Sequence, residues 1–318
     1  MKFRSLLAAL VCGFLALPPA SAQDAVPTAP AAPTVQAEMQ TIVGKIQAKM
    51  RAGQRSAEAL APEIAEFDAL LANHPEKNDA TGQVLLMKAL LYLQVLDDEA
   101  TAKTALTQLA SDFAGTKPAA QAARILQDLT PEAKAAAKAK AEAEAARAAA
   151  LIGQPAPALT FDWSSQEGLK TLADLKGKVV VLDFWATWCG PCIAAFPKIR
   201  EEVAHFAGSP VVVLGVTSLQ GRVHGDEPKP VDVRDNPARE YELTAEFMKK
   251  KDMTWPVAFS QQEVFNPDYV VRGIPHLTII APDGTVRHNA LNPHDPSADV
   301  VGKVTAILKE FNLQEPKA

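Results

Sequence analysis

The sequence predicts two folded domains: an all-α domain of helical hairpins, and after it an α/β domain whose central mixed sheet is flanked by helices. Two observations predict this fold class. Apolar residues recur at helical spacing through residues 36–130, whereas apolar β-branched runs alternate with helical segments through residues 151–318. The length of 318 residues leaves room for two hydrophobic cores.

The composition is that of a globular protein, with 48% hydrophobic and 22% charged residues. Lys and Arg together number 32 against 37 Asp and Glu, which gives a net charge of −5, and only 6% of the residues are aromatic. Nucleic-acid binding generally requires a basic surface and stacking side chains. We therefore expect no nucleic-acid partner.

Residues 1–22 have the pattern of a secretory signal peptide. Lys2 and Arg4 precede an apolar run over residues 6–17, and residues 20–22 (Ala-Ser-Ala) resemble a cleavage site. The run is too short for a spanning helix, and no later stretch reaches the roughly 18 apolar residues that such a helix needs. We expect an exported protein, in a bacterial periplasm or a similar compartment, that does not span the membrane.

Residues 23–35 are rich in Pro and Ala and are predicted to form a disordered leader. Residues 36–130 are predicted to form the helical domain. The segment 83–96 is apolar nearly all round, which predicts that it is the central helix. The last three helices, near 83–96, 100–113 and 118–129, weakly resemble tetratricopeptide-type repeats, and a generic helical domain is an equal alternative.

Residues 131–150 contain 12 alanines with Lys, Glu and Arg but no large apolar residue. This composition predicts a helical linker, roughly 30 Å long if fully helical. Its mixed charges argue against a basic binding arm. Gly153 and the prolines at 155 and 157 are expected to end it.

The second domain, residues 151–318, shows strand and helix patterns in alternation. Strands are expected at 159–162, 178–185, 210–216, 255–260, 276–280 and 285–289, and helices at 189–205 (interrupted at Pro197), 243–251 and 297–311 (with Ser297 as N-cap). Residues 219–243 are a long polar insertion, which is interpreted either as a solvated loop or as a functional one.

The cysteines indicate redox chemistry. Cys12 lies in the middle of the signal-peptide run, which argues against a lipid anchor, so the mature chain keeps only Cys189 and Cys192 in a C-x-x-C pair. A single close pair closes a tiny loop and contributes little chain entropy. A zinc site would need two more ligands, which the C-x-x-C pair alone does not supply, so no metal is expected.

Residues 180–192 (VVLDFWATWCGPC) resemble thioredoxin. Together with residues 272–286 (RGIPHLTIIAPDGTV), they make the region 151–318 similar to the TlpA-like branch of periplasmic thioredoxins. The resemblance implies a thioredoxin-like fold and thiol–disulfide exchange on protein substrates, with the Cys189–Cys192 disulfide as the only redox group and no other cofactor.

The residue pattern explains this chemistry physically. A strand followed by a helix near Cys189 places this sulfur at a helix N-terminus, where the dipole and free N–H groups favour the attacking thiolate. Cys192 lies one turn further on, more buried, and is expected to resolve mixed disulfides. Gly190 permits a tight turn, Pro191 has no N–H to lose in the first turn, and Trp188 shields one side of the site.

Two further positions belong to the predicted site. Asp183 lies within a buried strand, where burial raises a carboxyl pKa. The resemblance makes it the proton acceptor that activates Cys192, the alternative being an exposed Asp on an edge strand. Pro275 matches the family's cis-proline, and the backbone of Ile274 is expected to pair with substrate. The alternative is that Pro275 merely starts a strand.

Two positions depart from the family pattern. His276 stands where Thr or Ser is usual. It is a candidate modulator of the thiolate, or with the two sulfurs a ligand for a soft metal such as Cu(I), and a purely structural histidine is the favoured alternative. Ala195 stands where TlpA-like proteins often carry Glu, which puts a proton-transfer role for that position in doubt. Pro197 matches a structural, helix-kinking proline.

The sequence therefore predicts an exported oxidoreductase that reduces disulfides in protein substrates. An oxidising compartment implies a membrane electron donor that regenerates the dithiol. One alternative is a partner-binding or copper-handling module in which the helical domain recruits the target. A peroxidase is disfavoured because Thr187 lies two residues before Cys189 rather than three.

Overall fold

The computed structural model of the protein describes residues 34–225, 227 and 229–316. The predicted signal peptide 1–22 and residues 23–33 of the predicted leader lie outside the described residues. The chain divides into two compact units, Met1–Lys138 and Ala139–Ala318. Among the described residues, no helix combines the length and apolar character that crossing a membrane requires.

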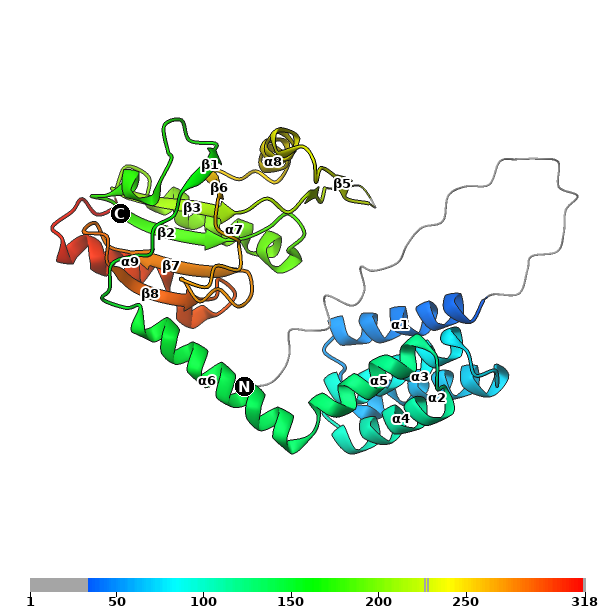
Figure 1. Ribbon diagram of the computed structural model, residues 1–318. Coiled ribbons are helices and arrows are strands. Elements are labelled where there is room, and N and C mark those ends of the chain that lie inside the picture. The colour runs from blue at the N-terminus through cyan, green and yellow to red at the C-terminus, as the bar shows by residue number, and fades with distance from the viewer. Residues whose placement is uncertain (1–33, 226, 228, 317–318) are drawn as a thin grey trace, which may run out of the picture. The chain divides into compact units, whose positions relative to one another are not determined.

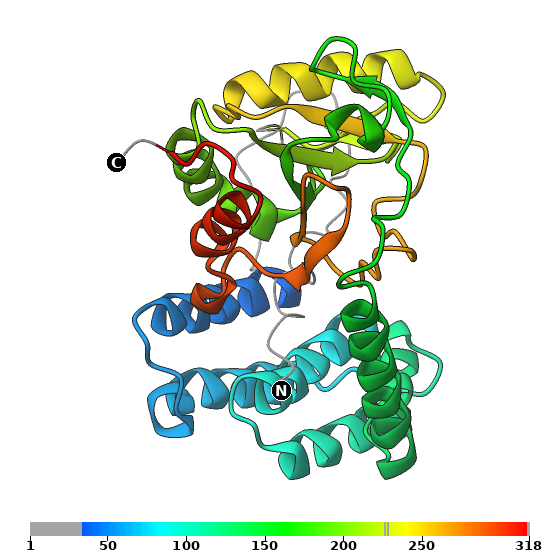
Figure 2. The ribbon, with the colours of Figure 1, turned by 90° about the vertical axis from the view of Figure 1, so that its left-hand side faces the viewer.

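Helices make up the described part of the N-terminal unit (Figures 1 and 2). They are α1 (Val35–Arg51), α2 (Ala57–Asn73), α3 (Asp79–Gln94), α4 (Glu99–Asp112), α5 (Lys117–Asp128) and the start of α6 (Pro131–Ala150). Polar N-cap side chains accept a backbone hydrogen bond at the start of α1 to α5. Helix α3 packs against α1, α2, α4 and α5, which confirms that the apolar segment forms the central helix.

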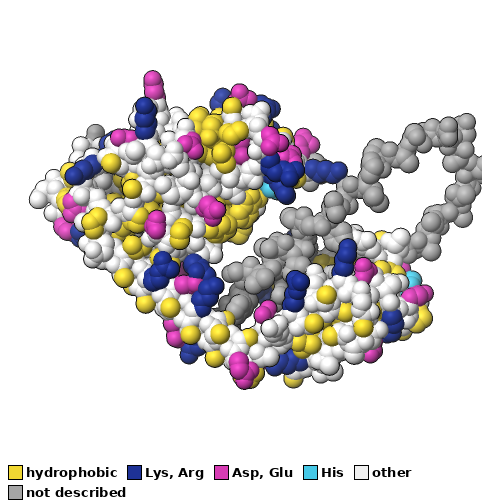
Figure 3. Space-filling model, in the orientation of Figure 1, with side chains coloured by type: hydrophobic (Ala, Val, Ile, Leu, Met, Phe, Trp, Pro, Cys, Tyr) yellow, Lys and Arg dark blue, Asp and Glu magenta, His cyan; other side chains and the backbone are white. Residues whose placement is uncertain are grey.

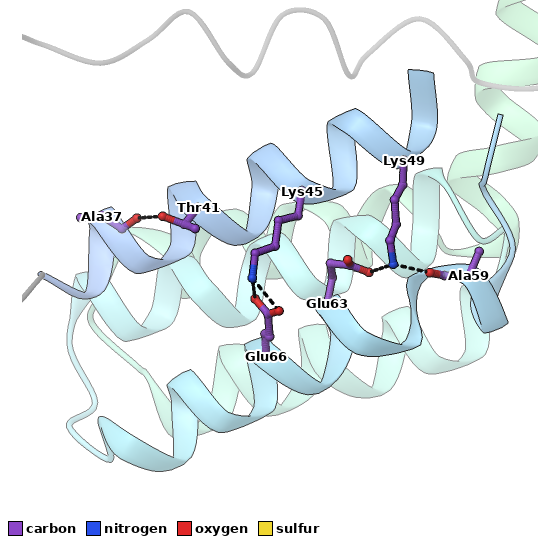
Figure 4. Close-up of polar contacts among 7 residues, drawn as sticks. All are labelled: Ala37, Thr41, Lys45, Lys49, Ala59, Glu63 and Glu66. Atoms are coloured by element: carbon purple, nitrogen blue, oxygen red, sulfur yellow. Dashed lines mark hydrogen bonds and ion pairs between the residues drawn. The ribbon is translucent and has the colours of Figure 1, made fainter. Parts of the chain in front are cut away.

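Two lysines of α1 reach across to α2 (Figure 4). Lys49 Nζ lies 2.7 Å from Glu63 Oε2 and donates to the Ala59 carbonyl at 2.7 Å. Lys45 Nζ lies 2.7 Å from Glu66 Oε1, and both of these side chains are exposed. An exposed pair of this kind contributes at most about 1 kcal/mol. The Lys49–Glu63 pair is more constrained because Glu63 is buried, only 4% exposed.

Helix α6 runs unbroken through the predicted linker, and side chains of both charges lie on it (Figure 3). The boundary between the two units falls inside this helix. Its second half packs on the C-terminal unit, because Glu144 pairs with Arg272 and Ala148 is buried. The second half therefore forms the predicted helix and in addition contacts the C-terminal unit at these two positions. The small side chain of Ala148 needs no large pocket. It lets α6 approach the C-terminal unit closely at the position where the Glu144–Arg272 ion pair forms.

The C-terminal unit is built on a six-stranded mixed sheet of order β1-β6-β3-β2-β7-β8 (Figure 1). Its strands are β1 (Phe161–Ser164), β2 (Val179–Phe184), β3 (Val211–Thr217), β6 (Val257–Ser260), β7 (His276–Ile280) and β8 (Val286–Leu291). Strands β2, β3 and β6 are parallel, whereas β7 is antiparallel to β2. Every residue of β2 and β7 is buried, as expected for central strands.

Two hydrophobic cores lie on the two faces of this sheet. One contains residues of α7 (Gly190–His205), α8 (Pro237–Lys250) and α9 (Val300–Glu310), and α7 and α9 lie on the same side of the sheet in Figure 2. The other contains residues 159–175, including the short helix η1 (Leu172–Leu175), and residues 264–271. The mixed sheet flanked by helices confirms the predicted fold class of this domain.

Several predicted boundaries were wrong. Helix α8 begins six residues before the expected position 243, because Asn236 caps it and Pro237 fits its first turn. Helix α7 is not interrupted at Pro197, since packing of its neighbours in the core offsets one missing backbone hydrogen bond. Asp299 rather than Ser297 caps the last helix: its Oδ1 accepts from Gly302 N at 3.1 Å.

Gly215 of β3 leaves room for a buried tryptophan. A Cβ at this position would lie 2.9 Å from Trp185 Nε1 and 3.1 Å from Val257 Cγ2, and neither residue has exposed surface. We expect Gly215→Ala to lower the free energy of unfolding of this domain by about 1–3 kcal/mol, the usual range for overpacking. All four tryptophans lie between residues 163 and 255, so urea unfolding followed by tryptophan fluorescence reports on this domain alone.

Gly225→Ala is the matched control in the same domain. A Cβ there has no neighbour within 4 Å, and we expect no loss of stability. Equal urea midpoints for the two variants would contradict the steric argument at Gly215.

Candidate active site

The two cysteines lie at the start of α7, directly after the loop that follows β2, and are joined in a disulfide. Cys189 is the N-cap residue of α7, and the backbone N–H of Cys192 donates to Cys189 Sγ at 3.1 Å. Both cysteines are buried. The first-turn N–H groups and the helix dipole act on the Cys189 sulfur and favour its thiolate once the disulfide is reduced.

Two exposed aromatic side chains, Trp188 and Phe265, lie together on the surface next to the cysteine motif. Trp188 is 41% exposed, and its Nε1 donates to Gln220 Oε1 at 3.0 Å. Its ring stacks with that of Phe265, 43% exposed, at a centroid distance of 6.2 Å. Gly190 and Pro191 are also exposed. The sequence reading missed Gln220 and Phe265, because they lie far from the cysteine motif and carry no motif of their own.

Asp183 is buried in the middle of the sheet. It lies on β2 opposite Gly215 of β3 and Leu277 of β7, and only 1% of its surface is exposed. Neither carboxylate oxygen has a hydrogen-bond partner in the structure. Burial, with the charge of Glu202 as a second cause, raises the pKa of Asp183 to about 7. The alternative of an exposed Asp on an edge strand is wrong.

Glu202 is a second buried acid near the site, and the sequence reading missed it. It lies on α7 and is 5% exposed. Burial raises the pKa of Glu202 to about 7 against the opposing effect of Lys198. Its position could have been found from helical spacing, because it shares the buried face of α7 with Ala195 and Ile199.

Ile274 and Pro275 directly precede β7, and the peptide bond between them is cis. Both residues are half-buried. Strand β7 pairs with β2 so that His276 lies opposite Phe184, the last residue of β2. The strand pairing thus brings the Ile274–Pro275 segment to the end of β2 from which the chain leads into the cysteine loop.

His276 lies on the other face of the sheet from the disulfide. Its ring packs edge-on against Phe184, which belongs to the opposite core, and its Nε2 lies 3.0 Å from Asn289 Oδ1. Burial lowers the pKa of His276, against the opposing effect of the Asn289 hydrogen bond. The structure does not bring this imidazole together with the two sulfurs. Among residues 34–225, 227 and 229–316, no group of three or more His, Cys, Asp or Glu side chains is arranged to hold a metal.

Part of the insertion 219–243 contacts the loop before Cys189, whereas most of its described residues are exposed to solvent. It contains β4 (Arg222–Val223), β5 (Val231–Asp232) and the first half of α8. Glu240 accepts from the backbone N–H groups of Gln220 and Gly221 at 2.7 and 3.0 Å. The His224 N–H donates to Thr187 Oγ1 at 3.1 Å, in the loop before Cys189. The insertion therefore supports both Trp188 and the cysteine loop.

A second loop contacts the cysteine motif from the end of β8. His294 Nε2 lies 2.7 Å from the carbonyl oxygen of Pro191, and Lys198 Nζ of α7 donates to the Pro293 carbonyl at 2.9 Å. The sequence analysis assigned no role to His294. Its contact with Pro191 depends on how β8 packs against α7 and α9, which no local pattern shows.

Comparisons with known proteins bear on the C-terminal domain. Residues 151–306 match the model of the Redoxin family. The thiol-disulfide oxidoreductase ResA of Bacillus subtilis is 27% identical over 134 residues, which cover 42% of this chain and 64% of that protein. The thioredoxin-like protein YneN of the same species is 29% identical over 136 residues, which cover 42% of this chain and 68% of that protein.

The ResA protein of Bacillus cereus is 31% identical over 136 residues, which cover 42% of this chain and 66% of that protein. The chain therefore spans just under two thirds of the length of the two ResA relatives described.

Proposed function

We propose that this chain is an exported thiol–disulfide oxidoreductase that reduces disulfides in protein substrates. Support comes from the match of residues 151–306 to the Redoxin family model and from the similarity to thioredoxin-like relatives. The observation that carries the proposal is the Cys189–Cys192 pair at the N-terminus of α7. The relatives named thiol-disulfide oxidoreductase support the same activity.

The first step is attack by Cys189. In the reduced protein its thiolate attacks one sulfur of a substrate disulfide, so that a mixed disulfide forms and one substrate thiolate leaves and takes a proton from solvent. The N-terminus of α7 and the Cys192 N–H stabilise the thiolate before this step. Because the two cysteines are almost equally buried, the N-cap position rather than exposure supports Cys189 as the proposed nucleophile.

The second step is resolution by Cys192. Its thiolate attacks the Cys189 sulfur, the substrate leaves with its second thiolate, and the Cys189–Cys192 disulfide forms. Two electrons pass from the protein to the substrate. Asp183 is the proposed acceptor for the Cys192 proton, since its pKa near 7 lets it exchange protons at neutral pH. Its position on the sheet face that packs under α7 supports this role.

The substrate is proposed to bind across the exposed side of the disulfide. Trp188, Gly190 and Pro191 form one side of this surface. The backbone of Ile274 and Pro275 forms the other and is proposed to pair with an extended substrate segment. The exposed ring of Phe265 extends the surface beyond the predicted residues.

The proposed compartment is the bacterial periplasm. The signal-peptide pattern of residues 1–22 supports export. An oxidising compartment would leave the cysteine pair as a disulfide, so a membrane electron donor is proposed to return two electrons after each turnover.

The N-terminal unit supports a second proposal, recruitment of the target protein. A hollow of about 450 Å³ lies among α2, α3 and α4. Its lining includes Lys77, Lys88, Tyr92 and Phe113, a mixture of cationic and aromatic side chains that suits a polypeptide segment. The copper alternative lacks such support, since His276 lies on the opposite face of the sheet from the sulfurs.

The reduction potential of the cysteine pair tests the proposed direction of electron flow. We expect a value near that of thioredoxin, about −270 mV, because Gly-Pro between the cysteines resembles reductants. The measurement equilibrates the chain lacking its signal peptide with glutathione buffers and traps free thiols. A value near −120 mV, that of a strong oxidant, would contradict reduction and assign disulfide donation instead.

Replacing both cysteines separates the two proposals. The Cys189→Ser, Cys192→Ser double variant removes the redox pair. If it still binds its partner and keeps its full biological effect, recruitment alone is favoured. Loss of effect with binding retained would favour the redox function.

A further inference from the structure

We propose that His294 is a positioning residue of the redox pair, acting on the Cys189 sulfur through the peptide unit between Pro191 and Cys192. The proposal rests on the thiol–disulfide exchange proposed above. His294 Nε2 lies 2.7 Å from the Pro191 carbonyl oxygen. Because a carbonyl oxygen only accepts hydrogen bonds, Nε2 carries the proton and donates.

One peptide unit connects this histidine to the sulfur. Its carbonyl oxygen, on Pro191, accepts from His294, and its N–H, on Cys192, donates to Cys189 Sγ at 3.1 Å. A hydrogen bond at one end of an amide polarises it and strengthens the hydrogen bond at the other end. A thiolate is a stronger acceptor than a thiol or a disulfide sulfur, so His294 selectively stabilises the reduced, ionised form of Cys189.

His294 is exposed, but the backbone that carries its ring is held in place by the fold. The backbone N–H of His294 donates to Asn292 Oδ1 at 2.9 Å. Lys198 Nζ, on α7 itself, donates to the Pro293 carbonyl at 2.9 Å and so ties the loop to the helix that carries the cysteines. Both contacts involve the peptide unit between Pro293 and His294, so the fold holds the backbone from which the imidazole extends before any substrate arrives.

Charged groups lie around the loop that carries His294, but the proposed effect does not depend on them. The pKa of Asp295 is lowered, mainly by its hydrogen bonds with Ser297. The charges of Lys198 of α7 and Lys303 of α9 lower it further. The carboxylate of Asp295 thus caps its own turn. The proposed effect needs only the Nε2 proton of His294, which both the Nε2–H neutral ring and the charged ring carry.

The test is the exchange equilibrium of the pair with glutathione, with the pKa of the Cys189 thiol measured by thiolate absorbance after reduction with dithiothreitol. We expect His294→Ala to raise that pKa and to shift the equilibrium about threefold toward the disulfide, equivalent to about 14 mV. His294→Gln retains a side-chain N–H donor and is expected to recover part of both shifts.

His288→Ala is the matched control, since His288 lies on β8 opposite Ile279. It is expected to change neither quantity. The proposal is overturned if His294→Ala leaves the thiol pKa and the exchange equilibrium at the wild-type values. It is also overturned if either His294→Gln or His288→Ala shifts both quantities as much as His294→Ala does. Failure of the wild-type pair to exchange with glutathione would instead refute the proposed function, and the thiol pKa of the reduced variants would still decide the role of His294.

Discussion

Cys192→Ser is expected to convert the protein from a catalyst into a covalent trap. Cys189 keeps its N-cap position on α7 and still attacks, whereas the part of the chain that the structure describes contains no other cysteine to release the substrate. The reduced variant mixed with oxidised glutathione should therefore accumulate one glutathione on Cys189, which intact-mass spectrometry and peptide mapping detect. Turnover of disulfide substrates should fall by about 1,000-fold or more.

Cys189→Ser is the matched control. Its remaining Cys192 is 1% exposed and lies inside the first turn of α7, beyond the stabilising N-terminus. We expect almost no glutathione adduct and a similar loss of turnover. An adduct that forms faster on Cys192 in the Cys189→Ser variant would reverse the assigned order of attack and resolution.

The position of Cys189 at a helix N-terminus was predictable from sequence because the pattern that determines it is local. A buried β-branched strand, a short loop and C-G-P-C fix the sulfur at a helix start without any distant contact. Asp183 was predictable for the same reason, since it lies within the strand pattern. The sequence analysis missed Glu202, although helical spacing indicates that it lies on the buried face of α7. His294 was missed for another reason, since it approaches from the loop after β8.

The sheet face on which His276 lies could not be predicted from the sequence. Its position beside Pro275 suggested a role at the disulfide, but successive side chains of a strand point to opposite faces. The register of β7 against β2 places His276 opposite Phe184, on the face away from α7. This placement fits the structural histidine that the sequence analysis favoured. Sequence proximity to Pro275 alone cannot settle the question, because only the pairing of two distant strands decides the face. The start of α8 is different, since Asn236–Pro237 was a readable cap signal within a segment interpreted as an insertion.

Asp183→Asn is expected to stabilise the C-terminal domain while it slows the enzyme. The pKa of Asp183 is about 7 in the folded protein, whereas an unfolded Asp has a pKa near 3.9. From pH 4 to pH 7 the native state retains a proton that the unfolded state has lost, so the free energy of unfolding falls as pH rises. The difference of about 3 pKa units corresponds to about 4 kcal/mol, fully expressed above pH 7.

The Asn variant lacks this titration. Its gain in stability over wild type should be near zero at pH 4 and grow to several kcal/mol at pH 8, with urea unfolding by tryptophan fluorescence as the measurement. Glu202→Gln should change the same profile in the same direction, because burial raises that pKa too. A gain for Asp183→Asn that is equal at pH 4 and pH 8 would contradict the buried-carboxyl argument.

The kinetic effect should have the opposite sign. An amide cannot accept the Cys192 proton, so the resolution step should slow by about 100-fold at neutral pH, a typical loss for one acid–base group. The mixed disulfide with glutathione should then persist in Asp183→Asn, although both cysteines are present. A variant that is more stable yet releases its substrate slowly would show that this unpaired buried carboxyl is retained for chemistry, since its charge weakens the fold above pH 7.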